Sequence, residues 1–207
     1  MQHDPLAGVD VGDRLARQLA FCLEIDKVKA VMRRNTLTDA SRPEGDAEHQ
    51  WHLAVMALIL AEYSARPVDV ARVVAMVLTH DLVEIDAGDA YIYDPVARAA
   101  AAAKEEAAAE RIFGLLPADQ GQWLRGLWDE FEANGTDDAR FARALDRIQP
   151  MLQNAASGGV SWTSHAIHAG QVTDIMAEVG PGAPALHELV LKMLDRLVDD
   201  GILLAAP

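Results

Sequence analysis

The segment 79–84, which reads Thr-His-Asp-Leu-Val-Glu, carries three side chains that could do metal or acid–base chemistry. It follows the apolar run 73–78, so we expect it to lie on a helix that is buried along much of its length. An isolated buried carboxylate is costly unless it is paired or bound to a metal ion. His80 and Glu84 are four residues apart and share a helix face, with Asp81 about 100° further round. Imidazole and carboxylate groups in this arrangement can bind one divalent ion.

Two further segments offer ligands of the same chemical kinds. His49 leads into the apolar run 53–61, and Asp146 lies in a segment whose nearest cations are Arg143 and Arg147. Each residue alone has a simpler interpretation, His49 as a hydrogen-bonded core histidine and Asp146 as a surface acid or the partner of one arginine. A His-Asp pair combined with a distant histidine and a distant aspartate indicates a metal site more strongly than any one of them does.

These residues must be positioned by helices, because apolar residues recur at spacings of three and four through most of the chain. Strand-like alternation is nowhere sustained, and no internal repeat or long linker divides the sequence. Caps and breakers predict about eight helices, at residues 13–33, 46–63, 69–86, 95–113, 119–132, 136–154, 164–179 and 185–200. The main expected loops are 35–45, 87–94 and 155–159. We therefore expect one all-α domain over residues 1–207.

Composition limits the classes of protein to which this chain can belong. Its 207 residues are 51% hydrophobic and 24% charged, as in soluble globular proteins, and its longest apolar run is far shorter than the ~20 residues of a membrane span. The net charge of −14 repels phosphate backbones and argues against nucleic acid polymers as partners. The N-terminal stretch lacks a secretory signal pattern, so we expect a cytoplasmic protein. The single cysteine, Cys22, lies in an apolar stretch and is expected to be a small core residue.

Three stretches, 41–49, 80–89 and 144–147, resemble the HD-domain metal-dependent phosphohydrolases, which share a His … His-Asp … Asp pattern. The run His-Asp-x-x-Glu, followed by Gly-Asp, is the most specific part of this resemblance. Within the family, the chain is most similar to the small HD proteins that include 5′-deoxynucleotidases. The resemblance covers about residues 15–155, and we expect residues 156–207 to be a helical C-terminal extension of the same compact HD-type domain.

The resemblance implies the ligands of one divalent ion, which are His49, His80, Asp81 and Asp146. Two imidazoles and two carboxylates suit Mn, Co, Fe or Zn, and also Mg. A single ion is expected because members of the superfamily that bind two recruit further histidines before the last aspartate. No histidine lies between residues 82 and 145 of this sequence. His52, three residues after His49, is the alternative for the first ligand.

The same resemblance implies roles for residues that do not bind the metal. Glu84 would orient or deprotonate the water that attacks phosphorus. Asp89 would contact the sugar and favour one without a 2′-hydroxyl. Arg33 aligns with an arginine that contacts phosphate, with Arg34 as the alternative, and both end the basic run 27–34. Each of these residues could instead be a solvated charge on a helix or loop.

The expected activity is release of phosphate from nucleoside 5′-monophosphates, with deoxy forms favoured, by a metal-activated water. The alternatives are hydrolysis of nucleoside triphosphates or (p)ppGpp, a non-catalytic nucleotide-binding HD module, and a purely structural helical dimer. One compact basic cluster favours a monophosphate, because enzymes that act on more phosphates usually need more cationic contacts. The expected partner is thus a small phosphate ester rather than nucleic acid or a membrane.

Other segments have simpler expected roles. His165 and His168, three residues apart, are expected to share a helix face or a dimer contact. The apolar last helix could belong to the core or to the interface of a homodimer, since the related proteins are commonly dimeric. The Ala-rich helix 95–113 is a strong helix former with a solvated charged face and no functional signal.

Overall fold

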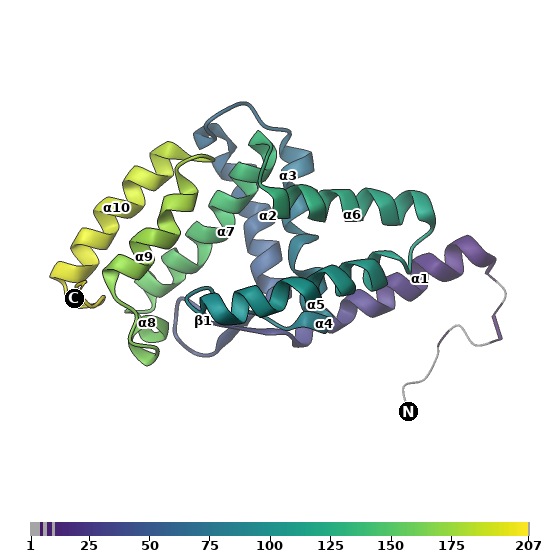
Figure 1. Cartoon of the computed structure of the whole chain (residues 1–207), viewed down its shortest axis with the longest axis horizontal. Coiled ribbons are helices and arrows are strands. Elements are labelled where there is room, and N and C mark those ends of the chain that lie inside the picture. The colour runs from purple at the N-terminus through teal and green to yellow at the C-terminus, as the bar shows by residue number, and fades with distance from the viewer. Residues whose placement is uncertain (1–4, 6–7, 10, 207) are drawn as a thin grey trace.

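The computed structural model describes residue 5, residues 8–9 and residues 11–206, and this part of the chain is mostly helical (Figure 1). The α-helices are α1 Asp13–Ile25, α2 Asp46–Leu60, α3 Val70–Val77, α4 Glu84–Ala87, α5 Pro95–Phe113, α6 Ala118–Ala133, α7 Asp137–Ala156, α8 Val160–Ser164, α9 Ala169–Met176 and α10 Pro184–Asp199. Shorter 3₁₀ turns are η1 Asp26–Ala30, η2 Ala61–Tyr63, η3 His80–Val83 and η4 Ala177–Val179. In the described residues, eight α-helices have seven or more residues, and the predicted all-α fold class is confirmed.

Polar side chains cap the N-termini of several helices. Asp69, Asp94 and Thr136 accept hydrogen bonds from backbone N–H groups in the first turns of α3, α5 and α7. At the start of α2, the Glu48 carboxylate accepts a hydrogen bond from the backbone N–H of Gly45 (3.0 Å). These signals are local in sequence, so the predicted starts of α2, α3, α5 and α7 agree with the structure to within one residue.

Two apolar clusters hold the helices together. The larger joins α2, α3 and α7 to α9 and α10, and its buried members include Leu53, Met76, Leu145 and Leu194. The smaller packs η1 and η3 against α5 and α6 around Phe113. Figure 1 shows α7 between α2 and the C-terminal helices α9 and α10. The C-terminal helices are therefore part of the main core, and they hold α7 in place from the side opposite α2.

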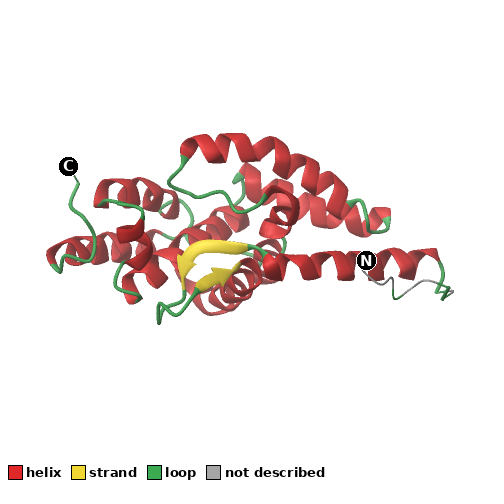
Figure 2. Ribbon diagram, turned by 90° about the horizontal axis from the view of Figure 1, so that it is seen from below, coloured by secondary structure: helices red, strands yellow, loops and turns green. Residues whose placement is uncertain are grey.

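The predicted first helix ends at Ile25 instead of continuing through the basic run 27–34. After η1, the chain forms strand β1 (Met32–Thr36), which pairs antiparallel with strand β2 (Pro43–Gly45) in the ribbon that Figure 2 shows in yellow. The expectation of helix is therefore confirmed for residues 13–25, but the expectations of one continuous helix to residue 33 and of an unbroken loop over 35–45 are wrong. The basic run has helical spacing and no breaker, and its pairing with β2 is a contact that local periodicity does not reveal.

The predicted helix 69–86 is broken near its middle. Helix α3 ends before the His-Asp pair, which lies on η3, and α4 follows directly. The hydroxyl of Thr79 donates a hydrogen bond to the carbonyl of Ala75 (2.6 Å), a contact of the kind that bends helices. His80 and Glu84 therefore do not share the face of one continuous helix, as their spacing predicts.

The C-terminal part agrees with prediction in α7 and α10 but not between them. Helix α7 passes through Pro150 without interruption. The predicted helix 164–179 instead begins at residue 169, as α9 followed by η4, and the short helix α8 comes before it at 160–164. In α10, Leu194 and most of its apolar neighbours are buried or packed on the core, whereas Leu189 is exposed. This helix thus contributes mainly to the core.

Cys22 is exposed on α1, so the expectation that it is a core residue is wrong. Its neighbour Phe21 is the buried side chain of α1, and adjacent residues of a helix point in different directions. The N-terminal stretch that lacks a secretory signal pattern lies mostly outside the described residues. Within the described part of the chain, no helix is long and apolar enough to cross a membrane.

Candidate metal centre

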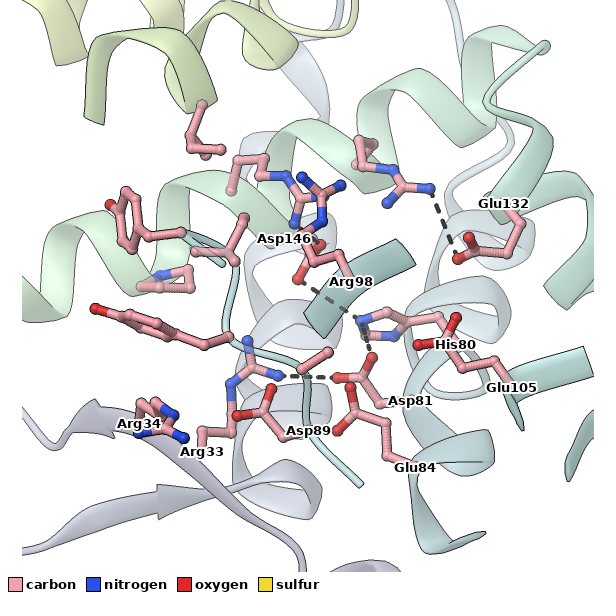
Figure 3. Close-up of a pocket in the computed structure, with 18 of the residues that line it drawn as sticks. Arg33, Arg34, His80, Asp81, Glu84, Asp89, Arg98, Glu105, Glu132 and Asp146 are labelled. Carbon is pink, nitrogen blue, oxygen red and sulfur yellow. Dashed lines mark hydrogen bonds and ion pairs between the residues drawn. The ribbon is translucent and has the colours of Figure 1, made fainter. Parts of the chain in front are cut away.

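The four predicted metal ligands come together where α2, η3 and α7 meet, as Figure 3 shows for three of them. His49 Nε2 lies 3.0 Å from Asp146 Oδ1, and His80 Nε2 lies 3.1 Å from Asp81 Oδ1. The two cross distances are 3.7 Å, from His80 Nε2 to Asp146 Oδ1, and 3.8 Å, from His49 Nε2 to Asp81 Oδ2. Metal–ligand bonds of about 2.0–2.2 Å separate neighbouring donor atoms by about 3.0–3.5 Å. The spacing of these donor atoms is therefore close to that around a single ion.

The two imidazoles are oriented so that Nε2 faces the cluster. His80 Nδ1 donates a hydrogen bond to the carbonyl of Val77 (2.9 Å), and His49 Nδ1 donates to Oε1 of Gln149 (2.9 Å). An imidazole held through Nδ1–H presents a lone pair on Nε2, which is the form that binds a metal. His80 Nε2 is buried and has no hydrogen-bond partner among the described residues. The donor set therefore fits a divalent ion, which would satisfy this atom.

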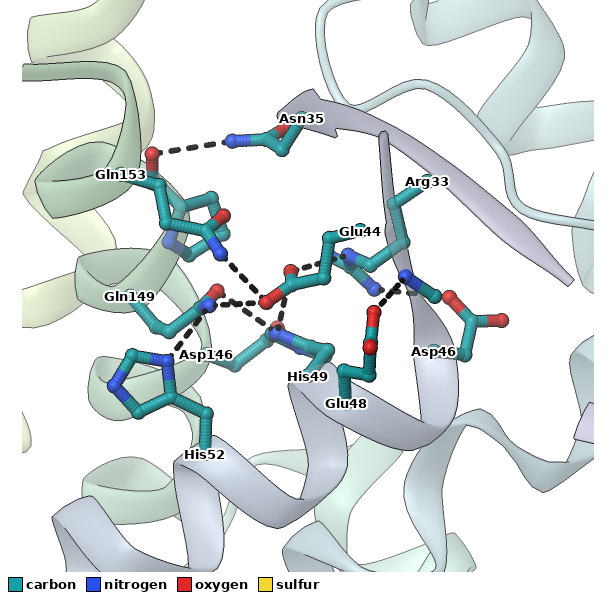
Figure 4. A network of polar contacts seen from close by, with 12 residues as sticks. Arg33, Asn35, Glu44, Asp46, Glu48, His49, His52, Asp146, Gln149 and Gln153 are labelled. Atoms are coloured by element: carbon teal, nitrogen blue, oxygen red, sulfur yellow. Dashed lines mark hydrogen bonds and ion pairs between the residues drawn. The ribbon is translucent and has the colours of Figure 1, made fainter. Parts of the chain in front are cut away.

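A buried polar network holds His49 in its orientation (Figure 4). Glu44 is 2% exposed and accepts hydrogen bonds from the side-chain amides of Gln149 (2.8 Å) and Gln153 (2.5 Å). Because the Gln149 amide donates to Glu44, its oxygen is available to accept from His49. His52 Nδ1 lies 3.2 Å from the Gln149 amide nitrogen, so the alternative ligand contacts this network and not the ligand cluster.

Asp146 is paired with Arg147, the residue that follows it in α7. Arg147 Nη1 donates to Asp146 Oδ2 (2.7 Å), and Arg147 Nε donates to Glu178 Oε2 (2.9 Å). Burial alone would raise the pKa of Asp146, but Arg147 and the two histidines outweigh it and hold the pKa well below its usual range. Arg143, the other arginine near Asp146 in sequence, instead donates to the carbonyl of Phe131 (2.9 Å).

A second group of acids lies beside the ligands. Asp46, Asp81 and Glu84 each place a carboxylate oxygen within 4.8 Å of the other two. Burial raises the pKa of Asp46 to about 7. Burial, followed by the charge of Asp81 and the proximity of Asp46, raises the pKa of Glu84 well above its usual value. A carboxylate with a raised pKa is a stronger base than an ordinary one. In the sequence, Asp46 has only the signature of a residue at the start of a helix, so its place in this group could not be predicted.

Arg33 lies among these acids. The alternation of β1 half-buries Arg33 and exposes Arg34, because successive strand residues point to opposite faces. Arg33 Nη1 lies 3.0 Å from Asp81 Oδ2 and 3.6 Å from Asp46 Oδ1, and its Nε lies 3.8 Å from Glu44 Oε2. This guanidinium thus balances the charge of several buried carboxylates next to the candidate metal centre.

Arg34 contacts an aromatic group at the outer side of the site. Its guanidinium lies 5.3 Å from the ring centre of Tyr91, and its Nη1 lies 3.5 Å from Nε2 of His165. The ring of His165 contacts the same tyrosine, with 4.8 Å between ring centres.

His168 does not belong to this group of Arg34, Tyr91 and His165, because it lies at the start of α9. The two histidines therefore do not share one helix face, and the dimer contact expected for them stays a prediction.

Asp81, Glu84 and Asp146 line a pocket of about 470 Å³ together with several arginines, as Figure 3 shows. Asp89 lies on its wall beside Arg33, and burial raises the pKa of Asp89 in spite of that arginine. Tyr91 and Tyr93 line the same pocket, and their ring centres are 5.4 Å apart. A concave pocket of this size with a few charged groups is suited to a small molecule.

Helix α5, in which the sequence shows no functional signal, contributes Arg98 and Glu105 to the wall of the pocket. In the described part of the chain, no carboxylate lies within ion-pair distance of the Arg98 guanidinium. Arg98 and Glu105 are seven residues apart and share one helix face. This spacing of two charged residues on an otherwise Ala-rich helix is the signal in the sequence that could have indicated a wall of the pocket.

A family model described as HD domain matches residues 25–187, a span that contains all four candidate ligands. The chain belongs to the HD-domain family. The resemblance to HD-domain phosphohydrolases and the HD-type helical fold, both expected from the sequence, are thereby confirmed.

Relatives of this HD-domain protein include enzymes and a solved structure. The 5′-deoxynucleotidases HDDC2 of Homo sapiens and Bos taurus are 30% and 31% identical to it over 136 residues. The aligned part is 65% of this chain and 65% of each relative, so the chain spans just under two thirds of their length. The crystal structure of a predicted metal-dependent phosphohydrolase from Magnetospirillum magnetotacticum MS-1 is 45% identical, with a TM-score of 0.89. That likeness covers 92% of this chain and 96% of the other.

Proposed function

We propose that this HD-domain protein is a metal-dependent phosphomonoesterase that releases phosphate from nucleoside 5′-monophosphates, with deoxynucleotides favoured. The observation that carries the proposal is the convergence of His49, His80, Asp81 and Asp146 beside a pocket lined by arginines. The 5′-deoxynucleotidase relatives support the substrate class, and the phosphohydrolase structure supports the reaction type.

The proposed ligands of one divalent ion are Nε2 of His49, Nε2 of His80 and the carboxylates of Asp81 and Asp146. When bound, Mn, Co, Fe, Zn or Mg supplies Lewis-acid polarisation of a phosphate ester and of water. The protein's part is to hold the donor atoms in place, through the Val77 carbonyl behind one imidazole and the Gln149 side chain behind the other.

Glu84 is proposed to orient the attacking water and to accept its proton. Its carboxylate lies next to Asp81 and is partly buried, so it adjoins the ligands without being needed as one. The raised pKa favours acceptance of the proton as the water oxygen bonds to phosphorus. When the bond between phosphorus and the 5′-oxygen of the sugar breaks, Glu84 can return this proton to that oxygen.

Three arginines are proposed to bind the phosphate group. Arg33 is the inner contact, since it lies 3.0 Å from the candidate ligand Asp81. Arg34 and Arg98 approach from β1 and α5, and no carboxylate in the described residues lies within ion-pair distance of either. These two can donate hydrogen bonds to a phosphate oxygen without breaking an ion pair of the protein. Arg98 is an addition that the sequence did not suggest.

The nucleoside part of the substrate is proposed to lie along the segment that follows α4. Asp89 would accept a hydrogen bond from a sugar hydroxyl, and the rings of Tyr91 and Tyr93 offer apolar faces for the base.

Three further proposals come from the sequence: one metal ion per chain, a homodimer and a cytoplasmic location. Sedimentation of the purified protein tests the dimer.

The test is a screen of nucleoside mono-, di- and triphosphates, in deoxy and ribo forms, with separate supplements of Mn²⁺, Co²⁺, Zn²⁺ and Mg²⁺. The expected result is inorganic phosphate from monophosphates, with deoxy forms turned over faster than ribo forms. Release of pyrophosphate or triphosphate from longer substrates would instead support the alternative hydrolase activities. Tight nucleotide binding without any turnover would identify a non-catalytic module.

A further inference from the structure

Arg147 is a buried arginine that the proposed reaction does not use. Its side chain is 10% exposed, that of Asp146 is 7% exposed, and that of Glu178 is 37% exposed. Nη1 of Arg147 donates to Asp146 Oδ2 at 2.7 Å, while Nε donates to Glu178 Oε2 at 2.9 Å. One guanidinium therefore bridges a candidate metal ligand on α7 and an acid on η4.

The two oxygens of Asp146 have different surroundings. Oδ1 faces the imidazoles, 3.0 Å from His49 Nε2 and 3.7 Å from His80 Nε2. Oδ2 accepts the hydrogen bond from Arg147. Because a carboxylate is planar, fixing Oδ2 also fixes the direction in which Oδ1 points. The guanidinium of Arg147 thus occupies Oδ2 of Asp146 and leaves Oδ1 facing the candidate metal centre.

This arrangement depends on Glu178. Neighbouring side chains of a helix diverge by about 100°, so residues 146 and 147 do not face each other by helix geometry alone. The second carboxylate, on η4, lies on the other side of the guanidinium and holds it against α7. Residue 178 lies far along the chain from residue 147, within the residues 25–187 that the HD-domain model matches.

Stability is a poor explanation for the bridge. A buried ion pair contributes little net stability, because desolvation of both charges offsets their attraction. Residues that orient metal ligands, by contrast, raise metal affinity by about 10- to 100-fold. We propose that Arg147, held by Glu178, is a positioning residue that reserves Oδ1 of Asp146 for the metal ion. The inference rests on the proposed function, since it takes Asp146 as a ligand.

The test compares metal affinity in purified variants, by calorimetric titration with Mn²⁺ and by the visible spectrum of the Co²⁺-loaded protein. Arg147→Ala is expected to weaken Mn²⁺ binding by about 10- to 100-fold and to change the Co²⁺ spectrum, because Asp146 is then free to rotate. Glu178→Ala is expected to produce a smaller loss of the same kind. Arg147→Lys should recover part of the affinity, since one ammonium can still contact Oδ2.

Arg140→Ala is the matched control, because Arg140 lies two turns earlier on α7 and pairs with exposed Asp137. It should leave metal affinity and the Co²⁺ spectrum unchanged. Unchanged Mn²⁺ affinity in folded Arg147→Lys and Glu178→Ala would overturn the inference, even if Arg147→Ala fails to fold. A raised KM with wild-type metal affinity would make Arg147 a substrate contact instead. Failure of the wild-type protein to bind any metal would refute the proposed function itself.

Discussion

At the scale of single residues, the candidate metal centre depends on how each imidazole is held. The Nδ1 atoms of His80 and His49 donate to Val77 and Gln149, which leaves both Nε2 atoms facing the acids. The His-Asp dipeptide could be found in the sequence because charged groups are unexpected inside an apolar run. The role of Gln149 could not, because it lies 100 residues from the histidine that it orients.

Glu84 can be separated from the metal ligands by one substitution. Glu84→Gln keeps the shape of the side chain but cannot accept a proton, so we expect kcat to fall by about 10²- to 10⁴-fold. Metal affinity should stay within about twofold of wild type, because this residue is not a proposed ligand. Steady-state kinetics with a deoxynucleoside monophosphate and a Mn²⁺ titration check the two quantities. Turnover at the wild-type rate would remove Glu84 from the mechanism.

Arg98 is expected to act on substrate binding. Arg98→Ala removes a guanidinium that faces the pocket, so KM should rise about tenfold, which corresponds to about 1.4 kcal/mol, within the range for hydrogen bonds to charged groups. kcat should change much less. Lys104→Ala, an exposed cation on the same helix, is the control and should leave both constants unchanged. Equal KM values for the two variants would mean that Arg98 is an ordinary solvated charge.

At the scale of elements, the predictions fail where distant contacts override local periodicity. Helix α3 stops before His80, at a point where Thr79 bonds back to Ala75 and no glycine or proline marks the break. The basic run leads into β1 because it pairs with β2, and that pairing decides that Arg33 is half-buried and Arg34 exposed. Capped starts, by contrast, could be read directly from the sequence.

Helices α3 and α6 are joined by an ion pair that gives a pH prediction. Hydrogen bonds from Arg72 and Thr136 lower the pKa of Glu130 below its ordinary 4.5. The stabilisation is therefore complete above the unfolded-state pKa and is lost as the pH falls through the lower folded-state pKa. Arg72 is partly exposed, so we expect about 1 kcal/mol or less.

Glu130→Gln tests this ion pair. Its melting temperature should lie below that of the wild type near neutral pH, and the gap should narrow as the pH falls below about 4. Calorimetric scans in the presence of a chelator keep the metal centre from contributing to the difference. A gap that stays constant across this pH range would show that the ion pair does not stabilise the fold.

At the scale of the whole molecule, the charge distribution explains how an acidic protein could bind an anion. The net charge is −14, yet five of the 18 cations are arginines that line the pocket beside the candidate ligands. Three of these arginines, Arg33, Arg143 and Arg147, pair with acids, so the positive charge that the protein's own acids do not balance comes from Arg34, Arg98 and a bound ion. Composition argues against nucleic acid polymers as partners, but it could not show that these arginines gather around one pocket.

The C-terminal helices are expected to be part of the cooperative unit of folding. Leu194 is 3% exposed and packs in the same cluster as α2, α3 and α7. Leu194→Ala should therefore lower the free energy of unfolding by about 2–5 kcal/mol in a single urea transition. Leu189→Ala, on the exposed face of the same helix, should cost about 0.5 kcal/mol or less. Two separate transitions would show that the C-terminal part folds independently.

The central claim is that His49, His80, Asp81 and Asp146 hold a metal ion on which phosphate release depends. The most direct measurement is phosphate release from a deoxynucleoside 5′-monophosphate by the chelated protein, before and after Mn²⁺ or Co²⁺ is returned. We expect no release after chelation, recovery on return of the metal, and no recovery in His80→Ala, whose metal affinity should fall by more than about 100-fold. Phosphate release that persists in the chelated protein, or that His80→Ala recovers with the metal, would contradict the account.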